Sequence, residues 1–123
     1  MEYRFFVDND VLRVEPPLVK HELPRDDATL LRIAIQKWET IVSLIEQEGR
    51  RFDNGGSGTC ALCKVYARSG CTGCPVFVAT GLDACDGTPY EDWTWADNMA
   101  AKLDTAQAEV IFLKEIAAGL DTG

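Results

Sequence analysis

The chain has 123 residues, of which 46% are apolar, and this size suits one globular domain with a single hydrophobic core. Its 20 acidic and 12 basic residues give a formal net charge of -8. Because proteins hold nucleic-acid backbones with clustered Lys and Arg, this charge argues against direct nucleic-acid binding. It favours instead a protein partner that presents a basic surface.

We expect a cytoplasmic protein without a membrane-embedded part. No apolar stretch approaches the roughly 20 residues that a membrane-spanning helix needs. The basic and apolar regions of a signal peptide are not seen in the first ten residues, MEYRFFVDND. In a reducing compartment, cysteine pairs more often bind metal than form disulfides.

Residues 1–25 predict a β-hairpin followed by an extended connector. Two runs, residues 3–7 and 11–15, are rich in β-branched and aromatic side chains, and a turn-forming Asp-Asn-Asp sequence separates them. His21, the single histidine, lies in the connector far from the cysteines. We therefore expect His21 to be a surface side chain rather than a metal ligand.

Residues 26–49 predict the first long helix, with Asp26 or Asp27 as its N-cap and Gly49 at its end. Its main apolar stripe is formed by Leu31, Ala34, Ile35, Trp38, Ile41, Val42 and Ile45. A narrower set lies nearly opposite and consists of Leu30, Ile33 and Leu44. Because a helix packed on one side needs only one stripe, we expect the hairpin or a partner chain to cover the narrower set.

Residues 92–120 are rich in alanine and other helix formers and predict a second long helix, antiparallel to the first. Its main stripe is formed by Met99, Leu103, Ala106, Val110, Leu113 and Ala117. Phe112 and Ile116 fall on the other side. Together with the narrower set of the first helix, these two residues would form a homo-oligomer interface if the hairpin does not cover them.

All five cysteines lie in the region between the predicted helices, residues 50–91, and they are Cys60, Cys63, Cys71, Cys74 and Cys85. The first four form two C-x-x-C pairs, and tetrahedral zinc takes four sulfur or nitrogen ligands. We therefore predict a zinc-bound lobe in which four of the five cysteines are ligands. The short spacer, residues 64–70, leaves open that Cys85 replaces one of the first four.

Two other uses of the cysteines stay open. An iron-sulfur cluster also takes about four thiolates, and Pro75 follows Cys74 as a proline follows cysteine ligands in ferredoxins. A cluster would make the chain a small electron-transfer protein. Disulfides are the third interpretation. A thioredoxin-like dithiol is not expected, because no βαβ pattern surrounds the C-x-x-C pairs.

Aromatic residues follow the last cysteine and are candidates for partner binding, since clustered aromatics are favoured at binding hot spots. The predicted partner-binding residues are Tyr90, Trp93, Trp95, Phe112 and Ile116. The alternative for the three aromatic residues nearest the cysteines is that they wedge the cysteine-rich lobe against the helix pair.

Three short patterns resemble a known group of proteins. They are C-x-L-C-x-x-Y at residues 60–66, C-x-G-C-P at 71–75 and C-x-G-T-P-Y-x-x-W at 85–93. They resemble small uncharacterised cysteine-rich proteins found mostly in bacteriophage genomes. The resemblance covers about a quarter of the chain and implies a phage or prophage setting, in the cytoplasm of a bacterial host. In that setting the partner would be a host protein such as a defence or transcription component.

The sequence as a whole predicts a single α+β domain spanning residues 1–123. A β-hairpin and connector (1–25) precede two long antiparallel helices (26–49 and 92–120), with a cysteine-rich metal-binding lobe (50–91) inserted between the helices. We expect no enzymatic activity, because no nucleophile is paired with a base and no glycine-rich phosphate loop follows a strand. The predicted function is that of a small acidic, metal-stapled module that binds a protein.

Overall fold

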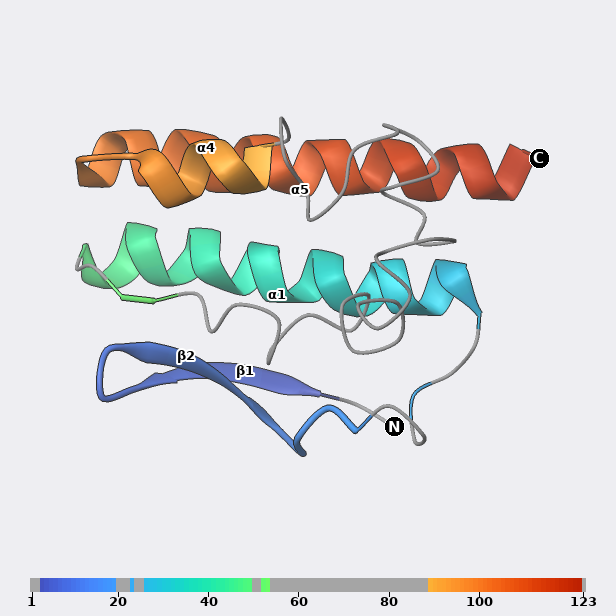
Figure 1. Cartoon of the computed structure of the whole chain (residues 1–123), viewed down its shortest axis with the longest axis horizontal. Coiled ribbons are helices and arrows are strands. Elements are labelled where there is room, and N and C mark those ends of the chain that lie inside the picture. Colours follow the sequence, from blue (N-terminus) through green and yellow to red (C-terminus); the bar gives the residue numbers. More distant parts are fainter. Residues whose placement is uncertain (1–2, 20–22, 24–25, 50–51, 54–88, 123) are drawn as a thin grey trace.

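The structure is a computed structural model that describes residues 3–19, 23, 26–49, 52–53 and 89–122. These residues form an α+β fold in which a β-hairpin, a central helix and a second helical layer are stacked (Figure 1). The five cysteines and most of the predicted lobe lie outside the described residues.

The predicted hairpin is confirmed. Strands β1 (Arg4–Asp8) and β2 (Val11–Glu15) pair in antiparallel register. The turn between them places Asn9 and Asp10 at φ of 55° and 62°. Short polar side chains of this kind tolerate the left-handed region, and two such residues form the turn whose twist suits a two-residue hairpin loop.

Helix α1 (Asp27–Glu48) is capped at both ends by the residues that the sequence indicated. The carboxylate of Asp26 accepts hydrogen bonds from the hydroxyl and, at 3.2 Å, from the backbone N–H of Thr29. The hydrogen bond from the Thr29 hydroxyl is the largest of the contacts that stabilise the ionised carboxylate, and it lowers the pKa of Asp26 below its usual 3.8. Gly49 ends the helix at φ 61°, and its N–H donates to the Ile45 carbonyl at 2.9 Å.

The prediction of one unbroken second helix is wrong. The chain forms a short helix α4 (Pro89–Trp95) and a long helix α5 (Met99–Thr122), which runs antiparallel to α1 (Figure 1). Asn98 begins α5, since its side-chain oxygen accepts from the Ala101 N–H at 2.8 Å. Asparagine is favoured at an N-cap and not inside a helix, so Asn98 restarts the helix after a turn.

Helix α1 is the central element, with the hairpin on one side and α5 on the other (Figure 1). The Gln36 side chain donates a hydrogen bond to the Tyr3 carbonyl and ties α1 to the start of the hairpin. Leu30 and Ile33 of the narrower apolar set are buried, and Leu44 is half-buried against the core. The expectation that both apolar sides of α1 are covered is therefore confirmed.

Two charged residues are buried between the layers, although the apolar stripes gave no sign of them. Lys37 of α1 is 1% exposed and Glu109 of α5 is 3% exposed. The Lys37 ammonium lies 5.5 Å from the centre of the Trp38 ring, a cation–π distance.

In the described part of the chain, no helix combines the length and apolar character that crossing a membrane requires.

Candidate protein-binding surface

The predicted metal ligands lie outside the described residues, as does His21; these ligands are Cys60, Cys63, Cys71, Cys74 and Cys85. Within the described ranges, no three His, Cys, Asp or Glu side chains are grouped so that they could hold a metal ion. The metal-binding lobe therefore stays a prediction. The structure does describe residues on either side of residues 54–88, which contain the cysteines.

Phe52 and Asp53 are the last described residues before residues 54–88, and Asp53 is fixed to the hairpin. The Asp53 N–H donates to the Asp10 carbonyl at 2.8 Å, and the Leu12 N–H donates to the Asp53 carbonyl at the same distance. Asp53 also forms an isolated parallel bridge with Val11. Phe52 itself is buried in the core.

Helix α4 is the first described element after residues 54–88, and Trp93 anchors it. The Trp93 ring is 5% exposed and meets Trp38 of α1 edge to face, with centroids 5.6 Å apart. Its centroid also lies 6.5 Å from that of Phe52. Phe52 lies two residues before residues 54–88 and Trp93 lies five residues after them, so this aromatic cluster holds together described residues from the two sides of that segment.

Lys102 of α5 holds α4 in place from the other side. Its ammonium lies 3.9 Å from the centre of the Trp93 ring and donates a hydrogen bond to the Trp93 carbonyl at 2.6 Å. The Trp93 indole N–H is buried, with no hydrogen-bond acceptor among the described residues. Trp93 is thus a core residue that packs α4 onto the helix pair, and it offers no surface to a partner.

The other predicted partner-binding residues differ in exposure. Trp95 is 75% exposed, whereas Phe112 and Ile116 are half-buried and pack against the core. Tyr90 belongs to α4, and its side chain lies outside the described part of the structure. Phe112 and Ile116 therefore give no separate argument for a homo-oligomer, because the single chain already covers much of their surface.

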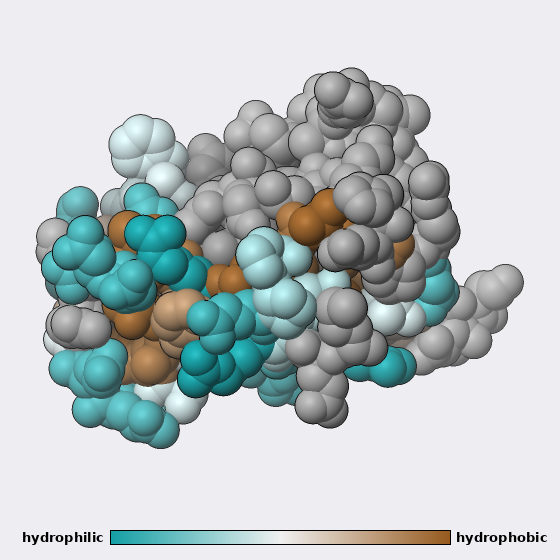
Figure 2. All heavy atoms as spheres, turned by 90° about the horizontal axis from the view of Figure 1, so that it is seen from below, coloured by the Kyte–Doolittle hydropathy of each residue, from teal (hydrophilic) through white to brown (hydrophobic). Residues whose placement is uncertain are grey.

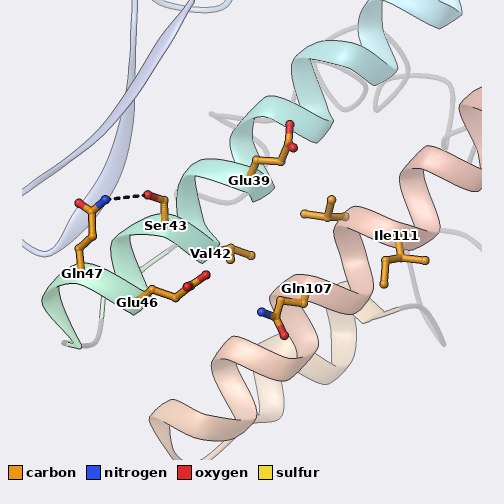
Figure 3. Close-up of a pocket in the computed structure, with 8 residues that line it drawn as sticks. Glu39, Val42, Ser43, Glu46, Gln47, Gln107 and Ile111 are labelled. Atoms are coloured by element: carbon orange, nitrogen blue, oxygen red, sulfur yellow. Dashed lines mark hydrogen bonds between the residues drawn. The ribbon is translucent and has the colours of Figure 1, made fainter.

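A groove that the sequence did not predict runs between α1 and α5 (Figure 3). Its volume is about 600 Å³. Residues from both helices line it, the apolar ones being Val42, Val110 and Ile111 and the polar or charged ones Glu39, Ser43, Glu46, Gln47 and Gln107. Ile111 is 58% exposed and is, with Trp95, one of the two large apolar side chains that are exposed among the described residues.

The groove has a mixed lining, with carboxylates beside apolar side chains. Near Glu39 an ion pair joins the two helices, with 3.4 Å between the Glu39 carboxylate and the Lys114 ammonium. Farther along α1, the Gln47 amide donates to the Ser43 hydroxyl at 3.1 Å. Glu46 projects from α1 toward Gln107 of α5 (Figure 3). Such a lining suits an apolar side chain that is flanked by cations.

One signal in the sequence could have revealed the groove. Residues 110–113 read VIFL, four consecutive apolar residues in a helix. Successive residues of a helix are turned by about 100°, so four in a row cannot all face one neighbour. At least one of them must point away from α1, and in the structure that residue is Ile111.

No family model matches this chain, and the searches of curated proteins and of solved structures find no match either. Its described residues define an α+β domain in which α1 is packed between a β-hairpin and the α4–α5 helices.

Proposed function

We propose that this chain is a small acidic protein-binding module whose partner presents a basic surface. The observation that supports it best is the α1–α5 groove, where Ile111 is exposed beside the carboxylates of Glu39 and Glu46. Exposed apolar residues with a polar rim are typical of interaction sites. The net charge of -8 acts in the same direction, since it attracts a basic partner over distance and repels an acidic one.

The hairpin face supports this choice by contrast. Figure 2 views the molecule from the hairpin side, where hydrophilic residues cover much of the described surface. The four charged residues of the two strands form two ion pairs, Arg4 with Glu15 at 3.0 Å and Arg13 with Asp8 at 3.4 Å. These pairs leave the strands themselves without net charge. The acidic groove is the better candidate.

For the cysteine-rich region we propose a zinc-bound lobe that uses four of the five cysteines. The contact between Phe52 and Trp93 supports it, because it holds residues that flank the cysteine-bearing segment near each other, and less entropy is lost when a metal closes a loop whose flanks are already close. The resemblance to phage proteins suggests a bacterial host cell as the setting. A host defence or transcription component would then be the partner.

Metal analysis tests the lobe. We expect near-stoichiometric zinc in protein purified without chelator, and Cys63→Ser should lower the thermal stability far more than Ser57→Ala. Iron with visible absorbance would favour the electron-transfer alternative instead, because zinc is colourless. Absence of both metals would contradict a metal-bound lobe.

Partner capture tests the function. The purified full chain is immobilised, bacterial lysate is passed over it, and the captured proteins are identified and then rebound in purified form. We expect proteins with basic surfaces, and we expect binding to weaken as salt rises from about 0.05 to about 0.5 M, which screens attraction between charges. Captured proteins without basic surfaces, or affinities that salt does not change, would overturn the proposal.

A further inference from the structure

We propose that the α1–α5 groove is the docking site for one amphipathic helix of the basic partner. Apolar side chains of that helix would pack on Ile111 and Val110, and its Lys or Arg side chains would lie over Glu39 and Glu46. This inference rests on the proposed function and deepens it, because it names the site and the form of the segment that binds there.

The shape of the groove favours a helix. Two antiparallel helices leave a furrow along their axes, and a third helix packed into such a furrow completes a three-helix bundle. The lining of α1 extends from Glu39 to Gln47. At 1.5 Å per residue this is about 12 Å, or roughly two helical turns. A docked helix would therefore use apolar residues at about positions i, i+4 and i+7.

The apolar part of the lining supplies the attraction. Ile111 is 58% exposed, and Val42 and Val110 beside it are half-buried. Covering these side chains removes apolar surface from water, which is favourable in proportion to the area covered. The face of α5 that packs on the core is different, since Ala106 and Leu113 are buried there.

The charges select a cationic occupant. Glu39 and Glu46 line the groove, and Asp104 and Glu115 lie on exposed turns of α5 next to Gln107 and Ile111 respectively. One of these carboxylates, that of Glu39, forms an ion pair with Lys114. A second copy of the chain would bring another -8 charge to this acidic site, and like charges repel. A basic helix meets no such opposition.

A designed peptide tests the site. The probe is a fluorescein-labelled peptide of 14 residues with leucine at i, i+4, i+7 and i+11 and lysine or alanine elsewhere. One control has the same composition in an order without an apolar face, and another carries glutamate in place of lysine. In anisotropy titrations with the full chain, we expect the first peptide to bind, the scrambled peptide at least about tenfold more weakly, and the acidic peptide not at all.

Substitutions then locate the binding. Ile111→Ser should weaken the lysine peptide about tenfold and Glu46→Gln about threefold, because one removes apolar contact and the other a single charge. The matched controls Trp95→Ser and Glu15→Gln, on exposed side chains elsewhere, should leave the affinity unchanged. All four side chains are exposed, and matching circular dichroism spectra and melting temperatures will show that the variants fold.

The outcomes separate this inference from the proposed function. Failure of the lysine peptide to bind, unchanged affinity in Ile111→Ser, or equal loss in Ile111→Ser and Trp95→Ser would each overturn the docking site. A chain that forms dimers by light scattering, and loses them in Ile111→Ser, would overturn it as well. None of these results would contradict the proposed function if the proteins captured from lysate still bind through basic surfaces. Only the capture experiment can overturn the proposed function.

Discussion

The two sides of the α1–α5 pair are covered very differently. On one side, here called the closed side, α4 lies over the helices, and Trp93 packs against Trp38 and Phe52 with 5% of its surface exposed. On the other side, here called the open side, the groove leaves Ile111 58% exposed beside Val42. Both sides carry large apolar residues, so composition alone does not distinguish them.

The difference shows how one short helix can cover the furrow between two packed helices. Two packed helices leave two furrows, and each furrow needs a further element to exclude water. The seven-residue helix α4 fills one furrow with a single indole ring, and Lys102 fixes it there. Among the described residues nothing equivalent fills the other furrow, and this is the side on which we propose that a partner binds.

Removing the indole from the closed side should have the largest effect on stability. We expect Trp93→Ala to lower the free energy of unfolding by about 3–5 kcal/mol, since it opens a cavity between α4 and α1. Thermal and urea unfolding will measure the loss. Trp95→Ala is the matched control, because its ring is 75% exposed, and it should change stability by less than about 0.5 kcal/mol. Equal losses in the two variants would contradict the assignment of Trp93 to the core.

Two neighbouring residues of α5 sharpen the comparison within one helix. Leu113 is 3% exposed, so Leu113→Ala should cost about 2–5 kcal/mol in urea unfolding. Ile111→Ala removes a similar number of carbon atoms from the open side and should cost less than about 1 kcal/mol. If Ile111→Ala proves as costly as Leu113→Ala, Ile111 is covered in solution and the groove is not open.

The parts that the sequence predicted correctly depend on local signals. The hairpin follows from two β-rich runs around a turn, and α1 follows from its apolar stripe between Asp26 and Gly49. Such caps act within one or two turns of the chain, so a pattern in the sequence is enough to place them. It was also predictable that another element covers the second apolar side of α1, because an apolar stripe is stabilised when a neighbouring element shields it from water.

The parts that were missed depend on contacts between distant elements. The burial of Lys37 and Glu109 depends on which elements pack around them, and residue spacing does not fix this. The break before Met99 fell in an alanine-rich stretch, where helix propensity concealed the cap at Asn98. The aromatic residues after the cysteines were ambiguous for the same reason, since the sequence cannot say which ring, Trp93 or Trp95, meets Trp38.

A smaller effect is expected from the lysine that holds α4. Lys102→Met keeps most of the side-chain volume but removes the ammonium from the Trp93 ring and carbonyl. We expect a loss of about 2–3 kcal/mol in thermal unfolding, because the variant loses a cation–π contact of about 0.5–1 kcal/mol and a charged hydrogen bond of about 1.5–2 kcal/mol. Lys114→Met, on the open side, should have less effect. A larger loss in Lys114→Met would mean that the exposed ion pair, and not the indole cluster, holds the helices together.

The smallest effect concerns the ion pair across the groove. The Glu39 and Lys114 side chains are 54% and 57% exposed. Exposed pairs of this kind contribute about 0.2–1 kcal/mol, and salt screens them. A double-mutant cycle with Glu39→Gln and Lys114→Met should therefore give a coupling energy of about 0.5 kcal/mol at low salt, which disappears at about 0.5 M.

The same pair gives the sharpest test of the charge of the open side. Lys114→Met removes the cation that neutralises Glu39, so a lysine-rich helix should bind the groove more tightly in this variant, by about threefold at low salt. Glu39→Gln should weaken the same peptide. Opposite changes from the two halves of one ion pair cannot arise from a general loss of structure, because misfolding would weaken binding in both. Changes of the same sign would show that the groove does not select its partner by charge.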